Sequence, residues 1–113
     1  MTTQQSKVFL SKIQESINKG DYDKYMTVPF MSKKLLYAAI KAKVVSKEAR
    51  GNNPILTDSE IKECINDAKE TAAYTAAVLF RTGILEKGED GKLCVSKKGQ
   101  IAIRDSLFKI NDN

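Results

Sequence analysis

Apolar residues recur at three- and four-residue spacing through the first half of the chain, and this pattern predicts two helices. The first runs from about residue 3 to 19, and Gly20 after it is suited to a C-terminal cap. Ser32 can cap the second helix. Residues 21–30 between the two helices contain Pro29, so we expect a loop there, anchored by aromatic side chains. The buried stripe of the second helix would consist of Leu35, Leu36, Ala39 and Ile40.

The end of the second helix is predicted less regularly than its start. Lys43 falls on the buried side of the helical wheel, so the helix can loosen there, with Val44 and Val45 extended instead. A clear break follows at residues 51–54, because the sequence Gly-Asn-Asn-Pro is suited to turns and not to a helix.

Residues 57–82 carry the main helical signal of the second half. Thr57 and Glu60 have the spacing of a capping box, in which each side chain accepts a hydrogen bond from the other residue's amide. Polar Asn66 and Asp67 then interrupt the apolar pattern, which favours two short helices joined by a turn. One continuous helix stays open as an alternative, because no glycine marks the turn and the residues after it are good helix formers.

The pattern switches from helical to extended after Gly83, which predicts a β-hairpin. Its strands would cover residues 84–87 and 92–95, on either side of a four-residue tip that begins and ends with glycine. Ser96 can then cap a last helix. The predicted fold class is therefore mainly α with a small β-hairpin. The apolar residues of the last helix are Ile101, Ile103, Leu107 and Phe108.

Length and composition limit the class of protein further. The 113 residues suffice for one hydrophobic core, so we expect a single domain. No apolar run approaches the roughly 20 residues of a membrane span. The first seven residues lack the features of a secretory signal, which predicts a cytoplasmic protein without membrane contact. Cys64 and Cys94 are far apart and are expected to be free thiols.

No histidine occurs in the sequence, so the usual metal ligand and neutral-pH general base are missing. Zinc sites and histidine-dependent catalytic triads are therefore excluded. No paired acids lie in an apolar stretch that would tune them for catalysis. We expect no enzymatic activity, no cofactor and no metal.

Three segments of the second half carry a resemblance to a known family. Their sequences are ILTDSEI, LFRTGILEK and VSKKG, at residues 55–61, 79–87 and 95–99. Within an order of short strand, two helices, hairpin and helix, they resemble winged helix-turn-helix regulators of MarR type and related bacterial and phage proteins. In that family a leucine four residues before a glycine packs the recognition helix, and Leu79 and Gly83 match. The resemblance covers about residues 55–105; it implies a winged helix-turn-helix over residues 55–110, with residues 1–54 as additional N-terminal helices.

The resemblance implies that a helix over about residues 69–82 lies in the major groove of duplex DNA. A helical wheel places Ala72, Ala76, Leu79 and Phe80 on the inward side. The alternative for the outward side is that Tyr74 and Val78 pack against the N-terminal helices. The outward residues expected to contact DNA are Lys69, Thr71, Tyr74, Thr75, Val78 and Arg81.

Basic residues outside this helix are further candidates for contacts to phosphates. The first 56 residues hold ten Lys and Arg against four acids, whereas the remaining 57 hold nine against ten, so positive charge gathers in the first half. A solvated helix face explains the same lysines, and the net negative charge of the hairpin opposes DNA binding. The candidates are Lys33, Lys34 and Lys41 in the second helix and Lys87 and Lys92 in the hairpin.

Two functions follow as expectations. The first is a DNA-binding transcription regulator. The second is a bacterial or phage adaptor or inhibitor that uses the same scaffold to bind a protein of a transcription or defence complex, and the acidic hairpin favours it. An RNA- or ribosome-associated module is a third alternative. The resemblance also implies a homodimer through the terminal helices, unless their apolar residues close the core of a monomer. The residues in question are Phe9, Ile13, Ile17, Leu107, Phe108 and Ile110.

Overall fold

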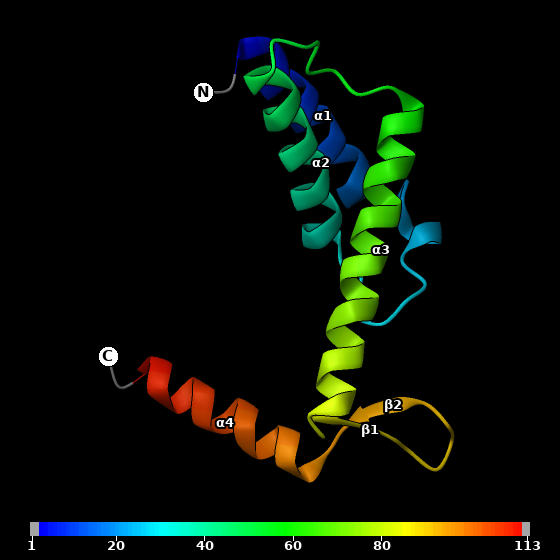
Figure 1. The fold of residues 1–113 in the computed structure, drawn as a ribbon, viewed down its shortest axis with the longest axis vertical. Helices are drawn as coiled ribbons and strands as arrows, with labels where there is room; N and C mark the ends of the chain where they lie inside the picture. The colour runs from blue at the N-terminus through cyan, green and yellow to red at the C-terminus, as the bar shows by residue number, and fades with distance from the viewer. Residues whose placement is uncertain (1–2, 112–113) are drawn as a thin grey trace. The chain divides into compact units, whose positions relative to one another are not determined.

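A computed structural model describes the backbone of residues 3–111 and the side chains of residues 3–105. It is mainly helical with one two-stranded antiparallel hairpin, which confirms the predicted coarse fold class (Figure 1). The chain divides into two compact units, residues 1–73 and 74–113. The elements are α1 (Gln4–Lys19), a short 3-10 helix η1 (Asp23–Tyr25), α2 (Lys33–Ala49), α3 (Asp58–Arg81), β1 (Leu85–Lys87), β2 (Leu93–Val95) and α4 (Lys97–Asn111).

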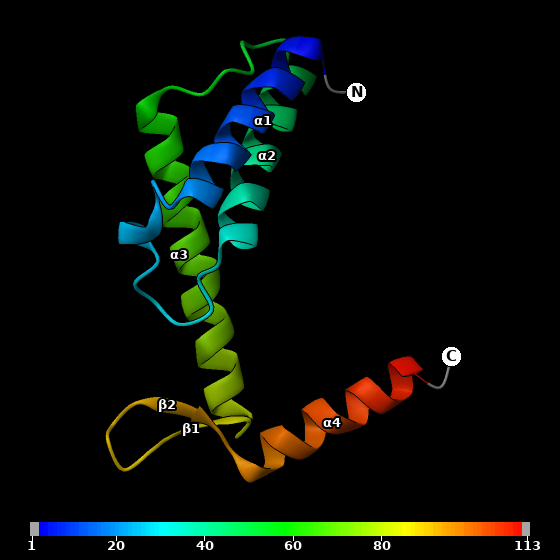
Figure 2. The same cartoon turned by 180° about the vertical axis from the view of Figure 1, so that it is seen from behind.

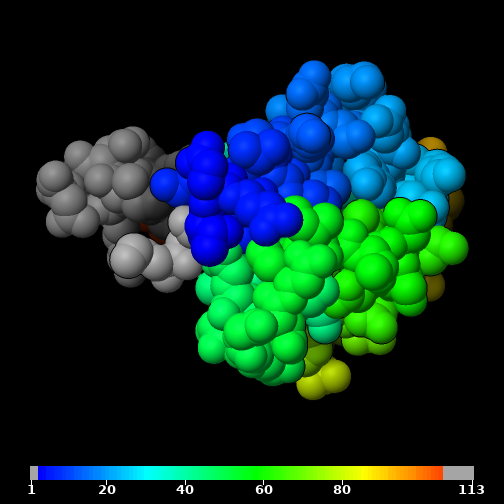
Figure 3. Space-filling view, turned by 90° about the horizontal axis from the view of Figure 1, so that it is seen from above, coloured from blue at the N-terminus to red at the C-terminus, as the bar shows by residue number. Residues whose placement is uncertain are grey.

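The first unit has a hydrophobic core between α1, α2 and the first half of α3, which lie side by side (Figure 2). In the space-filling view, the beginning of α1 lies against the segment that leads into α3 (Figure 3). The buried cluster shows that these helices share one apolar interior. It consists of Leu10, Ile13, Ile17, Leu36, Ile40, Val44, Leu56, Cys64 and Ile65.

The ends of α1 and the start of α2 follow the sequence prediction. Gly20 adopts a φ of 96° and caps α1, because its amide hydrogen-bonds back to the last turn. The Ser32 hydroxyl accepts a hydrogen bond from the amide of Leu35 at 3.1 Å. Between the helices, Tyr22 and Tyr25 pack against the core as the predicted aromatic anchors of the loop.

The expected loosening of the second helix is wrong, because α2 continues as a regular helix to Ala49. Within this helix the Val44 side chain is fully buried while Val45 is 43% exposed. The Lys43 ammonium group avoids the core by reaching an exposed ion pair with Glu63, at 3.8 Å.

Residues 58–81 form the single helix α3, so the preferred prediction of two helices and a turn is wrong. Asn66 and Asp67 are exposed and do not interrupt the buried stripe, which continues through Ala68 and Ala72. Alanine has the highest helix propensity, and both alanines pack inward. The helix therefore continues through this point, because neither propensity nor packing favours a break.

The short strand expected from residue 55, ahead of the capped helix, is also wrong. Ile55 donates its amide hydrogen to the Asn53 side chain at 3.1 Å, as in an Asx turn. Leu56 is buried in the core of the first unit. Within residues 3–111, the sheet therefore has two strands and not three.

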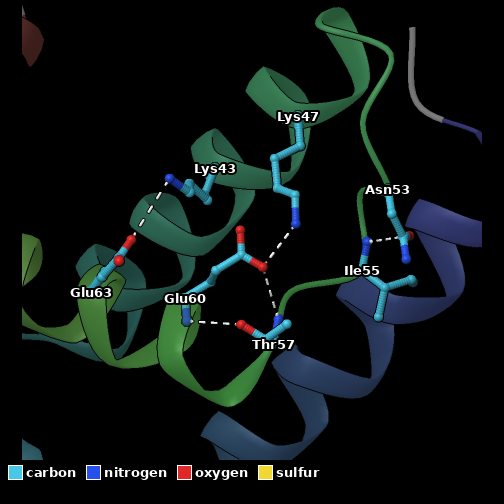
Figure 4. A network of polar contacts seen from close by, with 7 residues as sticks. All are labelled: Lys43, Lys47, Asn53, Ile55, Thr57, Glu60 and Glu63. Atoms are coloured by element: carbon cyan, nitrogen blue, oxygen red, sulfur yellow. Dashed lines mark hydrogen bonds and ion pairs between the residues drawn. The ribbon is translucent and has the colours of Figure 1, made fainter.

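The capping box at the start of α3 is present and is joined to α2 (Figure 4). The Glu60 amide donates to the Thr57 hydroxyl at 3.2 Å, and the Thr57 amide donates to the Glu60 carboxylate at 3.1 Å. The same carboxylate oxygen accepts a hydrogen bond from the Lys47 ammonium group at 2.8 Å. The hydrogen bond from Lys47, followed by that from the Thr57 amide, lowers the pKa of Glu60 from 4.5 to about 2.

We expect Glu60→Gln to lower the melting temperature at neutral pH. A carboxyl group with a lowered folded-state pKa stabilises the fold above its unfolded pKa of 4.5 and loses this effect as the pH falls towards about 2. The difference in melting temperature between the variant and the unaltered chain should therefore be constant above about pH 5 and shrink below it. Thermal unfolding followed by circular dichroism between pH 2 and 7 measures this difference.

The matched control is Glu63→Gln, which removes the more exposed ion pair to Lys43. It should change the melting temperature less, because exposed ion pairs contribute little to stability. A difference between Glu60→Gln and the unaltered chain that did not depend on pH would contradict the role given to the Glu60 carboxylate.

The second unit is organised around the turn from α3 into the hairpin. Gly83 has a φ of 81°, and the amide of Ile84 donates to the Leu79 carbonyl at 2.9 Å, which closes the helix end as a Schellman motif. The predicted hairpin is confirmed, with Leu85 opposite Val95 and Lys87 opposite Leu93.

Ser96 connects the end of α3, the hairpin and the start of α4. Its buried hydroxyl donates to the Gly83 carbonyl and accepts from the Gly99 amide at 3.0 Å, so it caps α4 as predicted. Its own amide donates to the Ile84 carbonyl at 2.8 Å. Because these bonds fix Ser96 between the end of α3 and the first turn of α4, the hairpin and α4 are held at one junction.

Candidate interaction surface

The predicted DNA contacts fall into two groups, one in each unit. In the first unit, Lys34 and Lys41 are exposed on α2 as expected. Lys33 is exposed as well, but its ammonium group lies 3.4 Å from the Asn18 carbonyl and 3.9 Å from the Asp23 carboxylate. These contacts partly neutralise the cation, so Lys34 and Lys41 are the clearer candidates for phosphate contacts.

The other basic residues of α2 are paired with α3. Lys47 is held by Glu60, and Lys43 by Glu63, as described above. The basic stretch from residue 33 to 50 is therefore less positive at its surface than its sequence indicates. An anion that approaches this stretch competes with carboxylates already in place.

The start of the predicted recognition segment is only partly available. The Lys69 ammonium group lies 5.7 Å from the centre of the Tyr25 ring, a cation–π distance, and the residue is half-buried. Thr71 is exposed, but its hydroxyl donates to the Asp67 carbonyl at 2.9 Å, one helical turn back. Lys69 thus has a packing role in the first unit.

In the second unit, the predicted contacts divide by exposure. Tyr74 is 72% exposed, and Arg81 is exposed on the same side of α3. Thr75 and Val78 are half-buried, so their expected outward orientation is only partly correct. The hairpin residues expected to contact DNA, Lys87 and Lys92, are both exposed.

The prediction that Phe80 faces inward is wrong, because this side chain is 48% exposed. Together with neighbouring residues of α3 and the hairpin it lines a shallow groove of about 530 Å³. The groove has a mostly apolar lining with two cationic side chains. Its lining residues are Ala76, Ala77, Phe80, Arg81, Lys87 and Leu93.

The hairpin contributes to this groove through one of its two faces. Leu85, Lys87, Leu93 and Val95 share that face, because Leu85 is paired with Val95 and Lys87 with Leu93. Leu85 is buried, whereas Leu93 and Val95 remain exposed. The opposite face is more polar and carries Glu86, whose carbonyl lies 3.5 Å from the Cys94 sulfur. The apolar face is thus only partly covered.

The described side chains of the second unit, residues 74–105, bury little apolar surface. Among its described side chains, Leu85 is the one large apolar residue that is buried. Tyr74 and Phe80 on α3 and Ile101 and Ile103 on α4 are exposed. The described part of the unit therefore has few buried apolar groups to stabilise it. Exposed apolar side chains in such a unit are typical of a surface that a partner covers.

The cations of the groove have no acidic partner in the part of the chain that the structure describes. Arg81 and Lys87 form no ion pair with any residue that the structure describes. Glu86 lies on the other face of the hairpin, and the Asp90 carboxylate accepts from the Lys92 amide at 3.1 Å within the tip. The groove therefore combines an apolar lining with positive charge that the described residues leave uncompensated.

The positions expected at a subunit interface differ between the two ends of the chain. In α1, Ile13 and Ile17 are buried and Phe9 packs against the same core, so these residues close the core of one chain, which was the alternative to a dimer contact. The side chains of Leu107, Phe108 and Ile110 lie outside the described residues.

Sequence reasoning missed the exposure of Phe80 because it treated the segment at about residues 69–82 as a separate helix. In the continuous helix the buried stripe runs through Ile61, Ile65, Ala68 and Ala72. Seven residues further along, this stripe leads to Leu79, which is half-buried, and leaves Phe80 to one side. Extending the stripe from the first half of α3 is the signal that could have identified Phe80.

Both cysteines are free thiols, as predicted. Cys64 is buried in the first unit, and burial raises the pKa of its thiol. Among the described residues, no cluster of acidic or cysteine side chains is arranged to hold a metal ion. Within the same part of the chain, no helix has the length and apolar character needed to span a membrane.

Comparison of the chain with models of protein families, with curated proteins and with solved structures gives no significant match.

Proposed function

We propose that this chain is a protein-binding module whose second unit docks another protein through the exposed apolar surface around Phe80. The single observation that carries the proposal is the groove between α3 and the hairpin, where apolar side chains stay exposed and Leu85 is the one large apolar residue buried among the described side chains of the unit. Fixed apolar surface of this kind is stabilised by burial against a partner, at about 25 cal/mol for each Å² removed from water.

The same geometry makes DNA binding the weaker proposal. Thr75 and Val78, two of the side chains expected to contact DNA, are half-buried, and Lys69 packs on Tyr25. Phe80 would face phosphates without a polar group to offer them. An adaptor or inhibitor of the bacterial or phage type anticipated from the sequence accounts better for an apolar groove.

A photo-crosslinking residue placed at position 80 tests the proposal. The full chain, with benzoylphenylalanine in place of Phe80, is expressed in its native host, and the cells are irradiated. We expect one or a few discrete adducts with other proteins, identified by mass spectrometry. The matched control carries the same residue at position 8, because Val8 is an apolar side chain of the first unit with similar exposure, 44% against 48%.

The two positions must give different results for the proposal to stand. Identical adducts from positions 8 and 80, adducts with nucleic acid alone, or no protein adduct from position 80 would each contradict it.

Duplex DNA is the second candidate partner, and one observation favours it. Tyr74, Arg81, Lys87 and Lys92 are all exposed within the second unit and could contact a phosphate backbone. Binding of the full chain to unrelated DNA fragments should then weaken steeply as salt rises, and Arg81→Ala should reduce it without changing the melting temperature. Absence of binding at low salt would exclude this function.

A further inference from the structure

The groove has a chemical signature that narrows the class of partner. Its apolar part comes from the small side chains Ala76 and Ala77, which leave room, and from Phe80 and Leu93, which supply contact area. A hollow of about 530 Å³ is large enough for a few apolar side chains. The groove is therefore suited to receive side chains from a partner.

The shape favours an occupant that inserts side chains over one that adds a strand. Each strand of the hairpin has three residues, so its free edge offers few backbone hydrogen bonds. The groove lies between a helix and the apolar face of the hairpin, where backbone pairing is not available. An amphipathic helix fills such a groove through apolar residues spaced three and four apart.

The charge of the groove adds a requirement for carboxylates. Arg81 and Lys87 both line it and have no acidic partner among the described residues. They come from different elements, the last turn of α3 and the end of β1. Carboxylates beside the apolar residues of a partner would pair with both cations, whereas lysines at the same positions would be repelled.

We infer that the groove binds an amphipathic helix of another protein that presents apolar side chains flanked by Asp or Glu. This inference rests on the proposed function and adds the chemistry of the partner. Phe80 and Leu93 supply the apolar contact, and Arg81 and Lys87 select the sign of the charge beside it. Exposed apolar side chains alone would not distinguish an acidic helix from a basic one, whereas the two cations would.

Three designed peptides test the inference on the full chain. Each is labelled with fluorescein, forms about four helical turns and is measured by fluorescence polarisation. The first has leucines at helical spacing flanked by glutamates; the second has lysines in place of the glutamates; the third keeps the glutamates but has serines in place of the leucines. We expect the acidic leucine peptide to bind about tenfold more tightly than the lysine peptide, and the serine peptide not to bind.

A charge-reversed variant with Arg81→Glu and Lys87→Glu should reverse the order of the two leucine peptides. Both side chains are exposed, so its helix content and melting temperature should stay close to those of the unaltered chain. The matched control is Lys7→Glu with Lys12→Glu, which makes the same change in net charge on exposed positions of α1. It should leave the order of the peptides unchanged.

The outcomes separate this inference from the proposed function. Equal binding of the acidic and basic peptides, with both lost in Phe80→Ser, would overturn the charge selection and leave protein binding at this surface intact. Failure of every peptide to bind would overturn the inference. The proposed function would still be tested separately by crosslinking at position 80. Concentration-dependent self-association that the acidic peptide does not reverse would assign the groove to a second copy and overturn the inference too.

Discussion

Replacing Ile40 by alanine is expected to lower the free energy of unfolding of the first unit by about 3 kcal/mol. The Ile40 side chain is completely buried on α2 within the apolar cluster formed with α1 and α3. Truncation removes its transfer free energy and leaves a cavity that close-packed helices fill only partly. Urea denaturation followed by circular dichroism at 222 nm measures the change.

Two neighbouring valines of α2 provide the control for this prediction. Val44 is fully buried and Val45 is 43% exposed, so the same substitution by alanine samples opposite sides of one helix. Val44→Ala should cost about 2 kcal/mol and Val45→Ala less than about 0.5 kcal/mol. Equal losses would contradict the burial of Val44 in the core and the exposure of Val45.

The local elements of this fold could be predicted because their signals lie within a few residues of each other. The left-handed Gly20, the Ser32 cap and the Thr57–Glu60 box each depend on neighbours no more than a few positions away. The hairpin followed in the same way from the glycines at its tip and the change of period after Gly83.

The continuity of helices could not be predicted, because it depends on contacts between distant segments. In the sequence, the polar residues Asn66 and Asp67 indicate a break in the helix. The structure shows that Ala68 is buried, so the buried stripe of the helix continues past them. Lys43 similarly resembles a break because its partner, Glu63, lies in another helix. In both cases tertiary packing outweighs a local preference of less than about 1 kcal/mol.

Glu48 shows the same limit for polar contacts. In the sequence it is the single acid within a basic stretch. In the structure its carboxylate accepts hydrogen bonds from the Ser6 hydroxyl and from the Thr3 amide, at 2.9 Å for the latter. These bonds, that from Ser6 first, lower the pKa of Glu48 and join the start of α1 to the end of α2. No spacing rule relates residues more than 40 positions apart.

For the candidate site, the sequence predicted the exposed cations but not the apolar groove between them. Arg81 and Lys87 were expected to contact a polyanion and are exposed. The groove depends on how the hairpin face with Leu93 packs near Phe80, and that packing is set by the turn at Gly83 and the junction at Ser96. A small change in that junction would therefore alter the proposed binding surface.

Replacing Gly99 by alanine is expected to disrupt this junction and to destabilise the second unit by more than about 2 kcal/mol. Gly99 is the glycine of the VSKKG segment, in the first turn of α4. A Cβ atom there would overlap the Ile84 carbonyl oxygen and lie 2.9 Å from the Val95 side chain. Because the overlap is with backbone, no change of rotamer relieves it, and α4 must move away from the hairpin.

Hydrogen exchange at the Ser96 amide is the most direct measurement, because this amide donates to the same Ile84 carbonyl. Its protection should be lost in Gly99→Ala, while the amides of Leu36 and Ile40 in the first unit stay protected. The matched control is Gly88→Ala, in which the nearest atom to a new Cβ is the Asp90 carboxylate oxygen at 3.1 Å, the end of an exposed side chain that can move at the cost of its hydrogen bond to the Lys92 amide, within the hairpin tip and away from Ser96. Retained protection at Ser96 in Gly99→Ala would contradict the close packing of α4 on the hairpin, since a backbone overlap at this position leaves the Ile84 carbonyl no room to keep both its place and its hydrogen bond.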